Sequence, residues 1–215
     1  MISIKQIYFS DKTLVNCYDC EFIMPYHNEV CTAHFENSVI VKLIEDEAHK
    51  AEPYFGVWSH RHSQKHRNFD PETLPEIIAN AECDIVSFFS KQNKKGIVST
   101  RVPRLYSNFK TLIKLLGYAD NNPNSHYILF NHFIALSEIY EEFVYNVLKP
   151  AISLIETHPE LSEVRKPYVY GASTIRFREN PKLSRDIGKY TMSPFLLEWL
   201  AGWWFKKMDY NLVQL

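Results

Sequence analysis

Apolar positions along the chain follow two spacings, alternation and helical repetition. Residues 2–10, ISIKQIYFS, alternate well enough to predict a first strand, whereas residues 38–51, SVIVKLIEDEAHKA, place apolar side chains on one face of a helix. The run YFGVWS at 54–59 is apolar almost throughout, which is typical of a strand buried on both faces of a sheet. The pattern therefore predicts a strand, a helix and a second, more central strand.

The rest of the chain continues this alternation. Further helices are predicted at 71–81, 108–117, 131–156 and from 193 onward, further strands at 83–89 and 126–130, and irregular segments at 11–36 and 157–192. Pro150 is expected to kink or break the long helix, and Ser193 to cap the last one, with Pro194 at its first position. Because helices and strands alternate without a repeat or a linker, we expect one α/β domain over residues 1–215, with a mainly parallel sheet flanked by helices.

Composition narrows the class of protein. The 215 residues are 46% hydrophobic and 14% aromatic, which is enough to build a substantial core. The net charge of −1 lacks the cationic surplus with which nucleic-acid binders displace phosphate counterions, so no nucleic-acid partner is expected. No apolar run is long enough to span a bilayer, and the first residues lack the apolar core of a signal peptide, so we expect a cytoplasmic protein.

Four potential zinc ligands lie close together near the start of the chain. They are Cys17, Cys20, Cys31 and His34, in two pairs with two residues inside each pair. The loop between the pairs, EFIMPYHNEV, is apolar, and no glycine follows either pair to ease the turns that wrap a zinc ion. We interpret the segment as a loop at the edge of a ligand pocket, with a zinc-stabilised binding module as an alternative.

A cationic, histidine-rich segment, HRHSQKHR, follows the strand at 54–59. Ligands of open α/β sheets bind at the carboxyl ends of the strands. Arg61 offers a planar fork of donors suited to phosphate, while His60 and His62 can donate to an anion or exchange protons near neutral pH. Anion binding, metal binding and a simple solvated turn all remain open for this segment.

Two carboxylates and one aromatic cluster are further candidates. Asp84 opens a predicted buried strand, where it is either a strand-edge carboxylate or a substrate ligand. Glu198 stands among apolar residues of the last helix and must be paired, exposed or functional. The cluster Trp203, Trp204 and Phe205, followed by two lysines, fits either a closed core or peripheral contact with the inner membrane.

Four segments in order resemble a bacterial family of glycosyltransferase-like proteins encoded with capsule and lipopolysaccharide genes. They are PYFGVWSHRHSQK, CDIVSFF, HYILFNHFIALSEIYEEFVYNVLKPAI and FLLEWLAGWW, and they span about residues 38–205. The resemblance implies a fold similar to the nucleotide-diphospho-sugar transferase (GT-A) fold. It further implies a hexosyltransferase-type enzyme of surface polysaccharide synthesis, which transfers a sugar from a nucleotide-sugar donor to a glycan acceptor.

The resemblance also implies roles for individual residues. His60 and Arg61 would line the donor diphosphate, Asn131 would lie near the sugar or the acceptor, and Glu198 would be the pocket carboxylate. We take Glu198 and His60 as the catalytic candidates, with Asp84 as a further substrate-binding candidate.

The chain departs from the family pattern in three places. It has His62 where a second arginine is expected, Trp199 where an arginine follows the glutamate, and no Asp-x-Asp, the usual clamp for Mn²⁺ or Mg²⁺ on the diphosphate. Whether a divalent metal takes part is therefore an open question. The positive charge that a metal would supply could come instead from Arg61, Lys65 and the flanking histidines. The alternative is a non-catalytic relative that binds a glycan or a partner protein.

Overall fold

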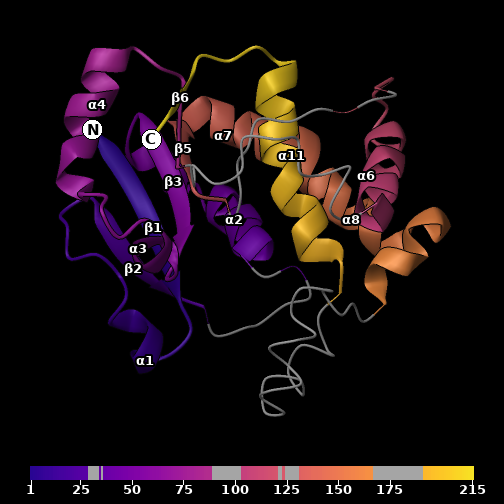
Figure 1. Cartoon of the computed structure of the whole chain (residues 1–215), viewed down its shortest axis with the longest axis horizontal. Coiled ribbons are helices and arrows are strands. Elements are labelled where there is room, and N and C mark those ends of the chain that lie inside the picture. Colours follow the sequence, from indigo (N-terminus) through magenta and orange to yellow (C-terminus); the bar gives the residue numbers. More distant parts are fainter. Residues whose placement is uncertain (29–33, 35, 89–102, 121–122, 124–130, 167–190) are drawn as a thin grey trace.

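The computed structural model describes residues 1–28, 34, 36–88, 103–120, 123, 131–166 and 191–215. Six strands form one sheet in the order β2-β1-β3-β5-β4-β6 (Figure 1). They are β1 Ile2–Tyr8, β2 Ile23–His27, β3 Tyr54–Ser59, β4 Ile85–Ser87, β5 Phe133–Leu136 and β6 Leu212–Gln214. β1 runs parallel to β2 and β3, and β4 runs parallel to β6, whereas β5 is antiparallel to both of its neighbours. The α/β class is confirmed, and the sheet is mixed because of the reversed β5.

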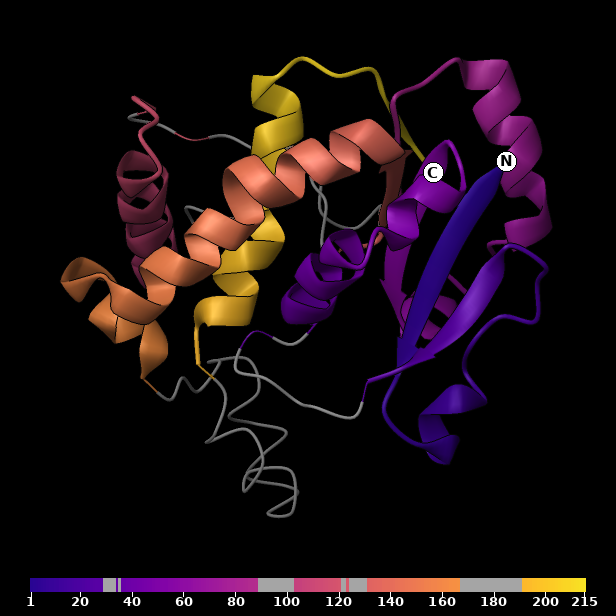
Figure 2. The same cartoon turned by 180° about the vertical axis from the view of Figure 1, so that it is seen from behind.

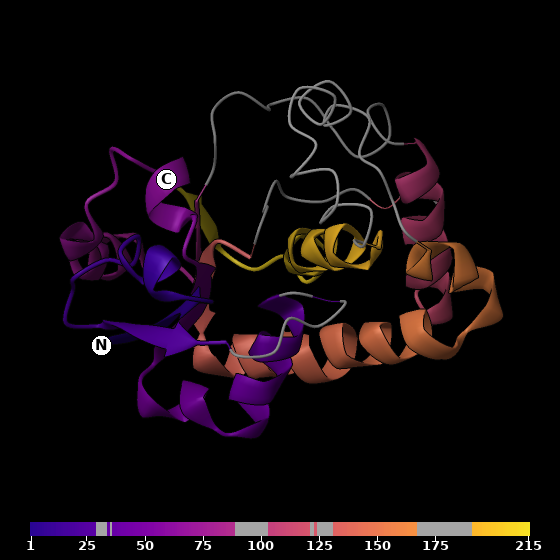
Figure 3. The same cartoon turned by 90° about the horizontal axis from the view of Figure 1, so that it is seen from below.

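Helices flank this sheet on both sides (Figures 1 and 2). The α-helices are α1 Asp11–Leu14, α2 Glu36–Glu45, α3 His62–Lys65, α4 Leu74–Ala81, α6 Pro103–Leu115, α7 Ser137–Phe143, α8 Lys149–Thr157 and α11 Ser193–Lys207. The 3₁₀ segments are η1 Ala48–Ala51, η2 Pro71–Thr73 and η5 Pro159–Arg165, and η4 Val144–Leu148 is a π-helix. α4 lies on one face of the sheet, and α2, α6, α7, α8 and α11 lie on the other (Figure 3).

The central strand β3 is buried on both faces, as its apolar sequence predicts. Phe55 and Val57 belong to the larger core cluster with α2, α7 and α11, while Trp58 belongs to the smaller cluster beneath α4. Gly56 permits the close approach of β5, because a Cβ atom there would lie 3.1 Å from Ile134 Cγ1 and 3.2 Å from the Phe133 carbonyl oxygen. β3 and β5 are thereby held together near the middle of the sheet.

The long helix after β5 is continuous across Pro150, so the expected break does not occur. The π-helical segment η4 ends directly before α8, which carries Pro150 in its first turn. Proline lacks an N–H and collides with the carbonyl four residues earlier, and a widened π turn can accommodate that conflict. The predicted strand at 126–130 lies outside the described residues. β5 instead occupies the predicted start of the helix, because periodicity alone cannot separate a short buried strand from a helical turn.

Among the helices of the described segments, α11 has the most buried residues. Its side chains Trp203, Trp204 and Phe205 are only 1%, 4% and 0% exposed, so this cluster belongs to the core and is not available to a membrane surface. Met192 holds the cap position that was expected for Ser193, whose hydroxyl contacts His34 instead. None of the helices in the described segments has the length and apolar character that crossing a bilayer requires.

The two strands at the edges of the sheet were missed by the sequence prediction. β2 contains Pro25, which an edge strand tolerates because its unpaired side needs no N–H donor, and most of its residues are at least partly exposed. β6 has only three residues and pairs with β4 alone. Neither strand has the apolar run by which a buried strand is recognised.

Candidate functional site

Two segments far apart in sequence meet at the carboxyl end of β3. The His60 N–H donates to the Ile7 carbonyl at 2.8 Å and extends the pairing of β1 and β3 by one residue, after which α3 begins. Because β5 runs in the opposite direction, its entry residues, Asn131 and His132, lie at this same edge. The sequence prediction that the histidine-rich segment and Asn131 share a site is consistent with this placement.

Three histidines from the two segments form a cluster. His62 is fully buried and stacks on Trp58, with ring centroids 3.9 Å apart and planes 6° from parallel. The Nε2 atom of half-buried His66 lies 3.1 Å from Nδ1 of buried His132. Phe88 packs edge-on against His62, with centroids 4.6 Å apart. The cluster is therefore enclosed by aromatic side chains.

Two hydroxyl groups lie within hydrogen-bonding distance of imidazole nitrogens in this cluster. Tyr18 Oη lies 3.2 Å from Nδ1 of His62, and Ser59 Oγ lies 3.2 Å from Nε2 of His132. Burial lowers the pKa of all three imidazoles, well below the ordinary value for His62 and His132. The neutral imidazoles keep lone pairs that can accept a hydrogen bond or bind a metal ion.

Charged residues from three helical segments surround Lys65. Lys65 and Arg61 are exposed and follow β3, while Glu36 begins α2 and Glu198 projects from α11. Lys65 keeps an exposed surface, but partial desolvation of its ammonium group by the surrounding protein lowers its pKa to about 8, and the nearby Glu198 opposes that shift. Burial raises the pKa of Glu36, against the pull of Lys65 and Arg61. The fold thus brings together two cations and two carboxyl groups, including the predicted Glu198.

His60 and Asn131 each have one buried side-chain atom without a hydrogen-bond partner among the described residues. His60 packs edge-on against Phe9, burial lowers its pKa, and its buried Nδ1 has no hydrogen-bond partner among the described residues. Asn131 adopts a left-handed backbone conformation with φ of 55°, which asparagine tolerates better than most residues. Its amide donates to Oδ1 of Asn37 at 3.2 Å, while its own Oδ1 finds no partner within the described segments.

Asp84 lies at the opposite end of the sheet. Its Oδ2 accepts the Asn211 N–H at 2.8 Å, and its backbone N–H donates to the Asn211 carbonyl at 2.9 Å. These bonds tie the segment that precedes β6 to the start of β4. The structure therefore accounts for Asp84 as a strand-edge carboxylate, and we leave it out of the candidate site.

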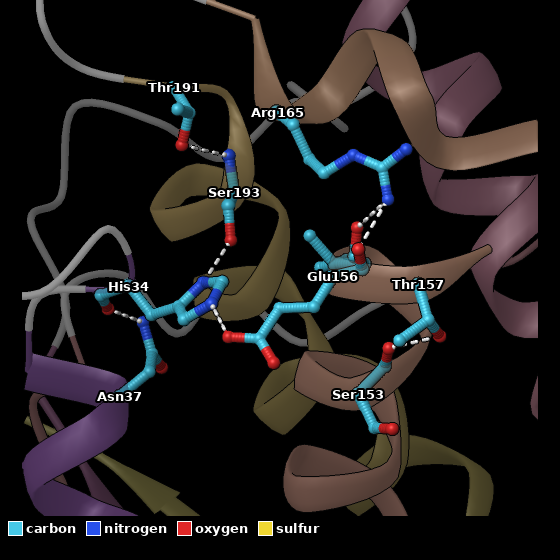
Figure 4. A network of polar contacts seen from close by, with 9 residues as sticks. His34, Asn37, Ser153, Glu156, Thr157, Arg165, Thr191 and Ser193 are labelled. Atoms are coloured by element: carbon cyan, nitrogen blue, oxygen red, sulfur yellow. Dashed lines mark hydrogen bonds and ion pairs between the residues drawn. The ribbon is translucent and has the colours of Figure 1, made fainter. Parts of the chain in front are cut away.

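The predicted zinc set is not brought together. His34 engages Ser193 Oγ through Nδ1 at 2.5 Å and Glu156 through Nε2 at 3.0 Å (Figure 4). The Cys17 thiol instead faces the Gln6 carbonyl at 3.9 Å. Cys17, Cys20 and His34 do not form a group able to hold a metal ion, and Cys31 lies outside the described residues. His34 serves to join the start of α11 to the end of α8.

Sequence reasoning missed His132 and Glu36 as members of this site, and it noted His66 in the cationic segment without choosing it as a site residue. His66 was visible in the cationic segment, and its spacing of four residues from His62 is a helical spacing, which was the available signal. His132 follows Asn131 directly, but the segment was assigned to a helix. Nothing in the sequence pairs Glu36 with Lys65, because that proximity depends on how α2 packs.

Comparisons with family models, curated proteins and solved structures found no match to this chain.

Proposed function

We propose that the carboxyl end of the sheet binds the diphosphate of a nucleotide sugar and that the chain transfers the sugar to a glycan acceptor. The observation that carries the proposal is the set of charges around Lys65. Two cations that leave β3 at the expected ligand-binding end lie near a carboxylate from α11. The GT-A-like fold expected from the sequence resemblance belongs to this proposal, and a mixed α/β sheet with its candidate residues at one edge is compatible with it.

Arg61 and Lys65 stabilise the diphosphate in this scheme. As the bond between the sugar and the diphosphate breaks, negative charge grows on the leaving oxygen, and fixed cations favour that charge. The guanidinium of Arg61 can donate two parallel hydrogen bonds to phosphate oxygens. Lys65 has a pKa of about 8, so it is mostly protonated at neutral pH, and a bound anion shifts it further toward the charged form.

Glu198 and His60 take the proton-handling roles. The acceptor hydroxyl oxygen forms the new bond to the anomeric carbon, and its proton passes to the Glu198 carboxylate. His60 lies next to Arg61 and hydrogen-bonds to the leaving diphosphate through its open Nδ1. Asn131 offers to a sugar hydroxyl its Oδ1, which has no hydrogen-bond partner within the described segments. The nucleoside diphosphate then leaves, and no further reactant is required.

A thermal-shift screen tests the binding half of the proposal. Nucleoside diphosphates and nucleotide sugars are added to the purified chain, each with and without Mn²⁺, because a ligand that binds only the folded state raises the melting temperature. We expect a selective rise for one nucleoside, and at least a 10-fold weaker affinity in Arg61→Ala. Arg67→Ala is the matched control, since Arg67 is an exposed arginine in the same segment. No shift in the folded wild type, or an unchanged affinity in Arg61→Ala, would contradict the proposal.

Turnover separates the enzyme from a binding-only relative. Release of nucleoside diphosphate from the donor that gives the shift, in the presence of acceptor glycans, is expected for the wild type and is strongly reduced in Glu198→Gln. A donor that binds without any release favours the non-catalytic alternative, to which the missing Asp-x-Asp points.

A further inference from the structure

We propose that His62, His66 and His132 form a binding site for a transition-metal ion of the Zn²⁺ type. This site lies beside the charged residues of the sugar-transfer proposal, but that proposal does not use it. The cluster comes from two segments 66 residues apart at their contact, so the fold and not a local motif assembles it.

The spacing of the three rings suits one metal ion. Each histidine offers a nitrogen atom, and the three nitrogens lie within 4.8 Å of one another. The ring centroids are 4.5, 4.6 and 5.3 Å apart. Three imidazoles around a tetrahedral zinc ion, with Zn–N bonds of 2.0–2.1 Å, place their centroids about 5 Å apart. The centroid separations are therefore close to those of a three-histidine site, while the nitrogens, up to 4.8 Å apart, would have to move closer together to bind one ion.

The hydrogen bonds of the cluster indicate which nitrogens would bind the metal. Tyr18 contacts Nδ1 of His62, so Nε2 of that ring would be the metal ligand, and Ser59 contacts Nε2 of His132, so the Nδ1 atom that faces His66 would be the second ligand. The Nε2 atom of His62 is fully buried and has no hydrogen-bond partner in the described part of the chain. The remaining pair, His66 Nε2 and His132 Nδ1, are 3.1 Å apart, close to the separation of about 3.4 Å that a tetrahedral site gives.

The surroundings resemble those of built metal sites. Histidine ligands usually bond through their second nitrogen to an oxygen that fixes the tautomer and the ring orientation, and the hydroxyls of Tyr18 and Ser59 do so here. The His66 N–H donates to the His62 carbonyl at 2.9 Å, so these two side chains have the helical i, i+4 spacing on which paired histidine ligands are found. His132 completes the set from the entry to β5.

The ligand set selects the class of metal. Three imidazoles suit Zn²⁺, Cu²⁺ or Ni²⁺, whereas Mg²⁺ and Mn²⁺ prefer oxygen ligands. Three protein ligands leave the fourth tetrahedral position for water or an anion, which is the composition of reactive rather than structural zinc sites.

A buried histidine that only packs and hydrogen-bonds is the competing explanation. It accounts for the contact between His66 and His132 and for the stacking of His62 on Trp58. It does not account for the buried Nε2 atom of His62, which has no hydrogen-bond partner among the residues that the structure describes.

Metal titration of the purified full chain, stripped of bound metal, tests the site without any nucleotide. We expect one equivalent of Zn²⁺ to bind, and Co²⁺ to bind in its place with the intense visible absorption of a tetrahedral site. His66→Gln should weaken Zn²⁺ binding by at least about 100-fold, and Tyr18→Phe by about 10-fold because it removes only an outer partner. His27→Gln, which alters an exposed histidine of β2, is the control and should bind as the wild type does.

Circular dichroism first establishes that each variant is folded, and His132→Gln replaces His66→Gln if the latter is not. The proposal is overturned if the folded wild type takes up no stoichiometric Zn²⁺ or Co²⁺. It is equally overturned if His66→Gln and His132→Gln both bind as tightly as the wild type. Thiolate-to-cobalt charge-transfer bands that disappear in Cys17→Ser would assign the metal to the cysteines instead. Failure of the nucleotide screen leaves these results unaffected, so the two proposals fail independently.

Discussion

The two ends of the sheet differ in how their polar side chains are satisfied. At the amino end, Tyr54 and Asp84 form hydrogen bonds with other groups of the protein. The Tyr54 hydroxyl donates to the Cys83 carbonyl at 2.5 Å, and Asp84 Oδ2 accepts the Asn211 N–H at 2.8 Å. These bonds hold the ends of β3, β4 and β6 in register, so a structural role accounts for Tyr54 and Asp84.

At the carboxyl end the polar groups remain partly open. His60 Nδ1, His62 Nε2 and Asn131 Oδ1 are buried atoms without a hydrogen-bond partner in the segments that the structure describes. Near the amino end, Ser3 Oγ, Glu52 Oε2 and both ring nitrogens of His49 share that property, although His49 Nε2 lies 3.4 Å from the Glu141 carboxylate.

The contrast is the reason for placing the proposed ligand at the carboxyl end of the sheet. A buried polar atom without a partner costs about 1–3 kcal/mol, so the three atoms at the carboxyl end are candidates for contact with a ligand. A bound diphosphate, sugar or metal ion would satisfy these atoms. The amino end has polar residues of similar types and uses them to fasten strands.

Trp58→Ala should have the largest effect on the fold. The indole is fully buried and supports His62 by stacking, so its loss leaves a cavity on the α4 side of the sheet. We expect the free energy of unfolding to fall by about 3–5 kcal/mol, measured by urea denaturation. Trp58→Phe keeps an aromatic surface beneath the imidazole and should lose less. A loss below about 1 kcal/mol for the alanine variant would mean that the indole does not support the carboxyl end.

Gly56→Ala should separate β3 from β5 and thereby weaken the contact between His66, which follows β3, and His132, which precedes β5. The new methyl group would meet Ile134 Cγ1 and the Phe133 carbonyl at 3.1 and 3.2 Å, and the backbone oxygen cannot rotate away. We expect a loss of about 1–3 kcal/mol by the same denaturation method. Gly117→Ala serves for contrast, because no atom lies within 4 Å there and its cost comes from a φ of 87° alone. Equal metal binding by wild type and Gly56→Ala would show that the histidine cluster does not depend on this approach.

Asp84→Ala should lower the free energy of unfolding without changing the affinity for a nucleotide. It removes the acceptor for the Asn211 N–H, and we expect a loss of about 1–2 kcal/mol in thermal or urea unfolding. Asp84→Asn keeps an acceptor oxygen and should recover most of that loss. A weaker affinity for a nucleotide in either folded variant would contradict the division between the two ends.

The thiols of Cys17 and Cys20 should be unreactive, with the smallest consequence for the fold. Burial raises the pKa of each thiol to about 11 from a model-peptide value of 9.0, so less thiolate is present at a given pH. At pH 8 we expect iodoacetamide to modify them about 100-fold more slowly than in the urea-unfolded chain, and the rate to rise as pH approaches 11. Peptide mass spectrometry measures each site. Fast modification at pH 8 would indicate thiolates and revive a metal or redox role.

Sequence reasoning could predict the features that depend on local pattern. The burial of β3 on both faces follows from its apolar run, and the cationic segment after it follows from the order of the chain. Glu198 could be singled out because a carboxylate among apolar residues requires an explanation. The class of fold followed from the alternation of elements.

Other features depend on packing that no local pattern reports. The reversed direction of β5 brings His132 to His66, and a strand of four residues carries too little periodicity to reveal its direction or even its type. The proximity of Glu36 to Lys65 depends on how α2 sits against the sheet. The spacing of Cys17 and Cys20 suggested zinc, but His34 is drawn to Glu156 and Ser193 by long-range contacts.

Calorimetric titration of two variants tests most directly whether the carboxyl end binds the ligand. The nucleoside diphosphate that stabilises the wild type most is titrated into Arg61→Ala and Asp84→Asn, which alter opposite ends of the same sheet. We predict at least a 10-fold loss of affinity in Arg61→Ala and wild-type affinity in Asp84→Asn. Equal affinities in the two variants, a loss confined to Asp84→Asn, or no binding to the folded wild type would contradict the account.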